Sequence, residues 1–93
     1  MPLTFDWDER KARSNLGKHG VSFEEAATIF GDRLSFTIPD PEHSSMEERY
    51  ITMGKGLTGK LLVVVHTDRG DNIRIISVRR ASRRERRFYE EIT

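Results

Sequence analysis

Residues 72–91 read NIRIISVRRASRRERRFYEE, and the organisation of the whole chain can be worked out from this stretch. Its first half is rich in isoleucine and valine, which is typical of a strand covered on much of both faces. Ser82 then offers a side-chain oxygen as a helix N-cap, and Glu85 three residues later completes a capping box. The sequence therefore predicts a buried strand that runs through a short corner into a C-terminal helix.

The same stretch is densely cationic. Guanidinium groups match phosphate geometry, and several of them release counterions when they bind a polyanion. Three interpretations stay open for these side chains: a solvated helix face, contacts to phosphates, and docking of an acidic partner. Arg79, at the strand end, is the best candidate for an anchored catalytic or phosphate-binding group. Seven arginines fall within fourteen residues, namely Arg74, Arg79, Arg80, Arg83, Arg84, Arg86 and Arg87.

Glu85 is the unusual residue of the predicted helix, because Ala81, Glu85, Phe88 and Ile92 form one helical stripe. The carboxylate is expected to close the capping box, or to pair with a strand arginine and hold its guanidinium in place. The two roles can coexist.

Composition bounds the class of protein. The chain has 93 residues, 33% of them charged and none of them cysteine, which excludes disulfides, thiolate metal sites and thiol nucleophiles. No apolar run approaches membrane-spanning length and no signal-peptide pattern is present, so we expect a cytoplasmic protein. The net charge of +1 hides an asymmetry: residues 1–48 hold five bases and ten acids, and residues 49–93 hold eleven bases and five acids. Such polarity predicts one surface for a polyanion and another for a different partner; the alternative is that the two halves neutralise each other in the fold.

The rest of the chain divides into short elements. A strand at 3–7 precedes a helix at 8–18 that Gly20 ends, and Ser22 with Glu25 opens a second helix at 23–31. Strands follow at 34–38, 49–53 and 60–67, separated by a loop at 39–45 and turns at 54–59 and 68–71. We therefore predict a single domain over residues 1–93 of α+β class and order β-α-α-β-β-β-β-α. Its sheet would be antiparallel, with the helices packed on one face.

Alternation along the strands assigns the two faces of this sheet. The helices would cover Ile51, Met53, Leu61, Val63, Val65, Ile76 and Val78. The open face would carry Tyr50, Thr52, His66, Ser77 and Arg79, together with Leu62, Val64, Ile73 and Ile75.

Two other motifs invite functional interpretations. Residues 54–61, GKGLTGKL, nearly spell a phosphate-binding P-loop, but Leu61 replaces the required Ser or Thr and a strand follows, so a hairpin turn is favoured. His19, His43 and His66 are scattered without metal-ligand spacing, and no metal or cofactor is expected. His66 would be the only group on the open face that titrates near neutrality, but a partly buried structural role is favoured for it over a chemical one.

Three segments together carry a family resemblance: FDWDERKARSNLGKHGVSFEEA (5–26), EERYITMG (47–54) and LLVVVHTDRGDNIRIISVRRASRRERRFYE (61–90). They resemble the BrnT family of toxins of type II toxin–antitoxin systems, over roughly residues 5–90. The resemblance implies a RelE/ParE-like fold and a small ribonuclease that halts translation. It also implies a BrnA-like antitoxin with a ribbon-helix-helix domain, through which a homodimeric or heterotetrameric assembly would bind operator DNA. The polar positions that match the family's pattern are Glu48, Arg49, Ser77, Arg79, Glu85 and Arg86.

The leading hypothesis is a metal-independent endoribonuclease that uses the 2′-hydroxyl of its RNA as nucleophile. Arg79 and Arg49 would stabilise the phosphorane, Ser77 would belong to the same catalytic set, and His66 or Glu48 would transfer protons. The flanking phosphates would be held by Arg80, Arg83, Arg84, Arg86 and Arg87. The alternatives are a non-catalytic basic module that binds nucleic acid and a surface that docks a protein.

Overall fold

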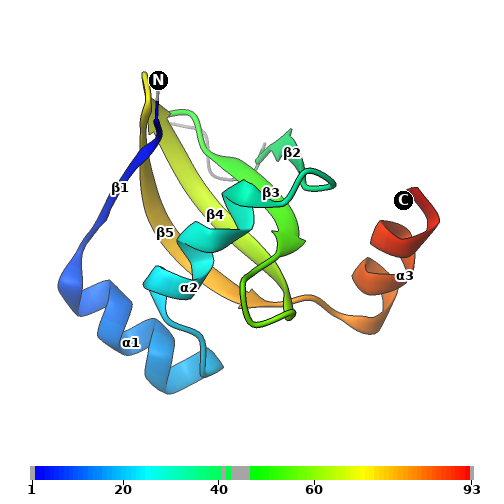
Figure 1. The fold of residues 1–93 in the computed structure, drawn as a ribbon. Coiled ribbons are helices and arrows are strands. Elements are labelled where there is room, and N and C mark those ends of the chain that lie inside the picture. The colour runs from blue at the N-terminus through cyan, green and yellow to red at the C-terminus, as the bar shows by residue number, and fades with distance from the viewer. Residues whose placement is uncertain (1, 41, 43–46, 93) are drawn as a thin grey trace.

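The structure is a computed structural model that describes residues 2–40, 42 and 47–92. Within these residues the chain forms five strands and three α-helices (Figure 1). The predicted α+β class and the order of the elements are confirmed. The strands are β1 (Thr4–Trp7), β2 (Phe36–Pro39), β3 (Tyr50–Lys55), β4 (Leu61–Arg69) and β5 (Asn72–Arg80). The helices are α1 (Glu9–His19), α2 (Phe23–Thr28), which continues into the 3₁₀ turn η1 (Ile29–Gly31), and α3 (Arg83–Ile92).

The sheet has the strand order β1-β5-β4-β3-β2. Strands β2 to β5 form the predicted antiparallel meander, but β1 pairs with β5 in parallel, with Thr4 opposite Asn72 and Trp7 opposite Ile75. The prediction of a wholly antiparallel sheet is therefore wrong at this edge. Hairpin turns force antiparallel pairing, whereas the long connection from β1 to β5 allows either direction.

The sequence predicted that all the helices pack on one face of the sheet, and this prediction is wrong. Helices α1 and α2 cover one face, which we call the covered face, and α3 packs against the other, which we call the α3 face (Figure 1). The covered face buries Leu62, Val64, Ile73, Ile75 and Val78 against Val21, Phe23, Ala26 and Ile29. The α3 face buries Met53, Leu61 and Val63 against Tyr89.

Several residues that were predicted on the open face consequently lie beneath α1 and α2. Alternation sorts a strand into two sets, but both sets are apolar here, and the pattern cannot tell which set meets which helix. A β-bulge adds a further shift, because the register between β4 and β5 slips between Val65 and His66. As a result β5 places Ile75 and then Val78 on the covered face, with one extra residue between them.

The helix starts follow the capping residues in the sequence. The Asp8 carboxylate accepts from the backbone N–H of Arg10 at 2.8 Å, and Gly20 ends α1 in the left-handed conformation with φ 70°. The Ser22 hydroxyl accepts from the N–H of Glu25 at 3.0 Å and starts α2. The carboxylate of Glu25 does not complete that capping box, because it accepts from the Thr58 hydroxyl of the β3–β4 turn.

The glycine-rich turn between β3 and β4 is a hairpin, as predicted, and it packs closely on α2 and η1. The N–H of Lys55 donates to Asp32 Oδ2 at 2.8 Å, and the N–H of Leu57 donates to Thr28 Oγ1 at 3.0 Å. A Cβ on Gly54 would lie 2.8 Å from that of Ser35, so the close approach requires glycine. The turn therefore ties the sheet to the helices.

None of the helices in the described residues is long and apolar enough to cross a bilayer.

Candidate functional site

Arg79 is held in a fixed orientation on the α3 face. Its Nη1 and Nη2 donate to Glu85 Oε1 at 2.8 Å and Oε2 at 2.9 Å. Glu85 Oε1 also accepts from the N–H of Ser82 at 2.8 Å, and the Ser82 hydroxyl accepts from the N–H of Glu85 at 3.1 Å. Glu85 thus fills both roles predicted for it, because the capping box that starts α3 also orients the strand arginine.

The electrostatics of this pair favour a permanently charged site. The hydrogen bond from Arg79 is the main reason that the pKa of Glu85 falls to about 2, and burial opposes the shift. The hydrogen bond to Glu85 in turn raises the pKa of Arg79. Because 46% of the Arg79 side chain is exposed, a ligand can still reach the guanidinium.

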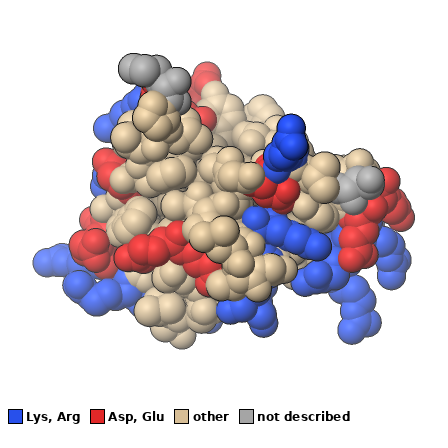
Figure 2. Space-filling view, viewed as in Figure 1, with Lys and Arg blue, Asp and Glu red and all other residues tan. Residues whose placement is uncertain are grey.

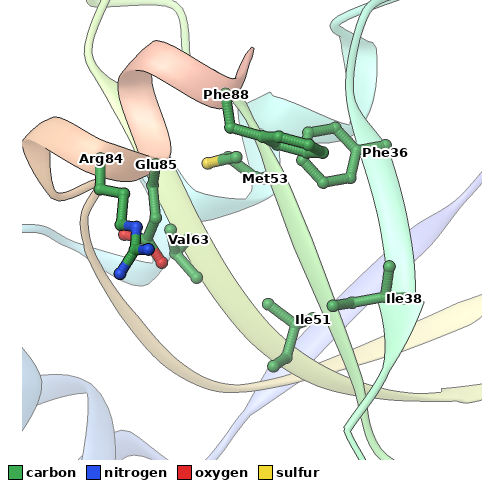
Figure 3. Close-up of a pocket in the computed structure, with 8 residues that line it drawn as sticks. All are labelled: Phe36, Ile38, Ile51, Met53, Val63, Arg84, Glu85 and Phe88. Atoms are coloured by element: carbon green, nitrogen blue, oxygen red, sulfur yellow. The ribbon is translucent and has the colours of Figure 1, made fainter. Parts of the chain in front are cut away.

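An open apolar groove of about 330 Å³ lies beside this pair, between α3 and strands β2 to β4 (Figure 3). The rings of Phe36 and Phe88 meet edge to face at one end, with centroids 5.3 Å apart, and Arg84 and Glu85 lie at another side (Figure 3). The lining residues are Phe36, Ile38, Ile51, Met53, Val63, Arg84, Glu85 and Phe88. An apolar groove with a few charged groups at its border can hold an extended ligand that has both flat apolar and anionic parts.

Helix α3, which forms one wall of the groove, is fastened to the body of the protein by Tyr89. Its hydroxyl donates to Asp32 Oδ2 at 2.7 Å, and the residue is 3% exposed. Burial and then the hydrogen bond to the Asp32 carboxylate raise the pKa of Tyr89 to about 12. The Lys55 ammonium lies 5.9 Å from the centre of the same ring. This wall is thus fixed by the core.

The remaining arginines of the C-terminal stretch are exposed. Figure 2 shows Lys and Arg side chains gathered around α3 and over α1, with Asp and Glu side chains between them. No carboxylate within the described residues forms an ion pair with the guanidinium groups at Arg80, Arg83, Arg84, Arg86 and Arg87. Arg74 differs, because it pairs with Asp6 of β1 at 3.3 Å.

His66 does not lie on an open face, and that prediction is wrong. The residue is 1% exposed on the covered face, where its ring meets Phe30 edge to face with centroids 5.0 Å apart. Nδ1 lies 2.6 Å from Asp68 Oδ1, and Nε2 lies 2.7 Å from Thr52 Oγ1, which in turn lies 2.7 Å from Thr37 Oγ1. These bonds connect an acid, an imidazole and a hydroxyl as in a catalytic triad, but Thr52 is 1% exposed and cannot reach a substrate. The structure supports the favoured interpretation, a buried structural histidine.

The prediction of an open face is also wrong for Tyr50 and Thr52, because the register places them on the covered face with His66. Ser77 and Arg79 do share the α3 face, opposite Val65 and Val63.

Glu48 and Arg49 lie away from Arg79. Across the sheet, Arg79 of β5 pairs with Val63 of β4, and Val63 pairs with Met53 of β3. Arg49 comes four residues before Met53. Arg49 and Arg79 are therefore about 13 Å apart along the strand direction and about 10 Å apart across two strands. The Glu48 carboxylate accepts from the Tyr50 hydroxyl at 2.7 Å, and this hydrogen bond raises the pKa of Tyr50. The predicted catalytic set is therefore split between two ends of the sheet.

Asn15 is a residue that the sequence interpretation overlooked. Its Nδ2 donates to the carbonyl of Val78 at 2.8 Å and, more weakly, to that of Val21 at 3.3 Å, while its Oδ1 accepts from the N–H of Val78 at 3.1 Å. Strand β1 has already ended at this level, so the amide takes the place of a neighbouring strand for Val78. A polar residue within the apolar stripe of a short helix was the available signal.

His43 and part of the predicted loop 39–45 lie outside the described residues. Within the described part of the chain, no three His, Asp or Glu side chains gather closely enough to hold a metal ion.

The fold and the arginine-bordered groove together define a small α+β protein that is suited to binding a polyanion. Among solved structures, the fold matches the ribonuclease toxin BrnT of Brucella abortus, with a TM-score of 0.68 and 23% sequence identity over 87% of this chain and 99% of that one. Comparison with curated proteins found no match.

A comparison at the level of families matches residues 7–85 to the family described as "Ribonuclease toxin, BrnT, of type II toxin-antitoxin system". The chain therefore belongs to the BrnT family of ribonuclease toxins, and the family predicted from the sequence is confirmed. An antitoxin partner and an RNA substrate follow from membership of that family.

Proposed function

We propose that residues 1–93 act as a single toxin domain that cleaves RNA without a metal ion and thereby halts translation. The reaction would take place beside the groove on the α3 face. The observation that supports this location is the orientation of Arg79 by Glu85, because a pre-organised cation next to an open groove can stabilise charge that develops on a phosphate.

In the proposed reaction the 2′-oxygen of the RNA attacks the adjacent phosphorus, and the bond from phosphorus to the 5′-oxygen breaks. The products are a 2′,3′-cyclic phosphate and a 5′-hydroxyl. Three N–H groups of Arg79 donate to Glu85 and to the carbonyl of Arg80. Guanidinium has five N–H donors, so Nε–H and one N–H of Nη2 remain for the phosphorane oxygens. Arg84, at the border of the groove, would bind the same or the next phosphate.

The positions of the other predicted catalytic residues limit their roles. A carboxylate whose pKa is about 2 is a poor base near neutrality, so Glu85 acts as a positioning residue. Burial excludes contact between His66 and RNA. Glu48 and Arg49 would contact a more distant nucleotide of the same RNA, and Ser77 would contact a nearer one. The exposed arginines of α3 would contact the flanking phosphates.

The test is incubation of the purified protein with end-labelled RNA in EDTA, followed by analysis of the product ends. We expect fragments with 2′,3′-cyclic phosphate ends. Arg79→Ala should lower the cleavage rate by about 100-fold or more, in the range found when one transition-state donor is removed. Arg10→Ala, which removes one positive charge from the surface of α1, is the matched control and should cleave normally. An Arg79→Ala protein with full activity would refute the assignment, and loss of cleavage in EDTA with rescue by Mg²⁺ would refute metal independence.

For the partner, we propose a ribbon-helix-helix antitoxin that covers the α3 face in a heterotetramer and carries the complex to operator DNA in the cytoplasm. The apolar groove and the exposed Phe88 (51% exposed) support a protein contact on that face. The mass of the co-expressed complex by light scattering, and its binding to operator DNA with and without the toxin, would test this assembly.

A further inference from the structure

A second groove, which is polar, lies between α1 and β5, apart from the apolar groove beside Arg79. Strand β1 pairs with β5 only as far as Ile75, and beyond that point Asn15 joins α1 to the strand. The groove along this junction has a volume of about 240 Å³. That is room for about eight water molecules at roughly 30 Å³ each, so a sugar-phosphate unit fits.

The residues around this groove include Lys, Ser and His side chains, which are types that bind phosphate groups in proteins. Lys11, Ser14 and Lys18 recur at helical spacing on one side of α1, with His19 after them, and Ser77 faces them from β5. Within the described residues, neither lysine forms an ion pair with a carboxylate, and neither serine hydroxyl has a hydrogen-bond partner. Two cations and two unused hydroxyls therefore surround one concave space.

The opposite side of α1 offers a useful contrast. Arg13 lines a separate groove, where Glu9 and Glu24 are also present. An anion approaching that side meets two carboxylates, whereas the groove beside β5 has no acidic residue among those that line it. The arrangement of charges thus selects one side of α1 for an anion.

The groove is also close to the proposed reaction site. Ser77 precedes Arg79 by two residues on the same strand, and both residues stand on the α3 face. Two residues of a strand span about 6.6 Å. A single RNA strand that places one phosphate at Arg79 therefore has another phosphate within reach of Ser77 and the lysines.

We propose that the groove formed by Lys11, Ser14, Lys18 and Ser77 binds a backbone phosphate of the RNA near the cleaved bond. This inference rests on the proposed function, and it extends the RNA path from α3 across β5 to α1. The groove contributes affinity and register, and Arg79 contributes the chemistry.

The test measures binding of a labelled RNA whose 2′-hydroxyls are methylated, so that it cannot be cleaved by attack of the 2′-oxygen. Fluorescence anisotropy over a series of salt concentrations gives the affinity and its salt dependence. Lys11→Gln/Lys18→Gln removes the two groove cations, and Arg10→Gln/Arg13→Gln removes two charges from elsewhere on the same helix. A third variant, Ser14→Ala/Ser77→Ala, removes the hydroxyls without changing the charge. Thermal unfolding of all three confirms that they are folded.

We expect Lys11→Gln/Lys18→Gln to weaken binding about tenfold and to reduce the slope of log K against log salt by about 1.4, the value for two contacts to a single strand. Ser14→Ala/Ser77→Ala should weaken binding without reducing the slope, and Arg10→Gln/Arg13→Gln should change both quantities much less.

Equal effects of the two double charge variants would overturn the inference, and so would a lysine variant that loses affinity for the antitoxin alone. In either case normal cleavage by the unmodified protein would leave the proposed function standing. A protein that neither binds nor cleaves RNA would overturn both.

Discussion

The two faces of the sheet each carry an acid joined to a basic side chain, but in different surroundings. On the covered face His66 contacts Asp68 and Thr52 beneath Phe30, and the imidazole is sealed from solvent. On the α3 face Arg79 contacts Glu85 at the border of an open groove. The bond geometry alone would make the histidine the better catalyst. Access to substrate favours Arg79 instead, because a buried hydrogen-bond network can stabilise the fold but cannot contact RNA.

The difference also explains where charge is concentrated. Buried polar groups need hydrogen-bond partners, and Thr52 and His66 find theirs in each other and in Thr37 and Asp68, which lie at the surface. The carboxylate can only accept, so in the neutral imidazole Nδ1 carries the proton and Nε2 accepts from Thr52. The α3 face instead leaves N–H groups of Arg79 and Arg84 available to a ligand. Substitutions on the two faces should therefore act on different quantities.

The largest effect on stability is expected for His66→Ala. Removing the ring creates a cavity under Phe30 and leaves Thr52 without one of its partners, which should lower the free energy of unfolding by about 3 kcal/mol. Urea unfolding measures this change. Leu57→Ala, at a side chain that is 87% exposed, is the control and should change it by less than about 0.5 kcal/mol. The folded fraction of the variant should still cleave RNA, and an inactive but fully stable His66→Ala protein would give the histidine a chemical role.

A smaller effect is expected for Tyr89→Phe, which removes the hydrogen bond from α3 to Asp32. The free energy of unfolding should fall by about 1.5 kcal/mol, because the acceptor is a carboxylate. Since the pKa of Tyr89 is raised from 10.0 to about 12, the stabilisation is fully present below pH 10 and is lost as pH rises towards 12. The difference between the two proteins in urea unfolding should shrink over that range. A constant difference would show that the hydroxyl does not titrate with the fold.

The smallest effect on stability is expected for Glu85→Gln, at about 1 kcal/mol or less, because the ion pair is partly exposed. The pKa of Glu85 is lowered from 4.5 to about 2, so its contribution is present above pH 4.5 and is lost as pH falls towards 2. Acid titration of the unmodified protein and the variant, followed by circular dichroism, should therefore converge in that range. Cleavage by the variant should be slower but not abolished, since Arg79 keeps its charge and loses its orientation. An unchanged rate would remove Glu85 from the site.

Much of this architecture could be predicted from local sequence. Ser22 and Ser82 begin α2 and α3, and the glycine-rich turn joins β3 to β4, as expected. Glu85 could also be predicted, because the capping box and the ion pair with Arg79 both act between residues close in the chain. The helix that was expected at 23–31 ends as α2 at Thr28 and continues as a 3₁₀ turn, a difference that local pattern does not resolve.

Other features depended on contacts between distant segments. The parallel pairing of β1, the two sides taken by the helices and the placement of His66 on an open face were all mispredicted. In each case both alternatives had the same local pattern, since the strands are apolar on both faces and one bulge shifts the alternation.

By itself, the sequence determined the elements, their order and the arginine-rich end, because these depend on residues that are near one another in the chain, and its motifs taken together indicated the family. Only the tertiary structure decided which polar groups a ligand can reach. Packing of α1 and α2 closes one face over His66, and the bidentate bond from Glu85 holds Arg79 at the border of a groove on the other. The physical reason is that burial is a property of the whole fold, and the same side chain is structural or reactive according to what covers it.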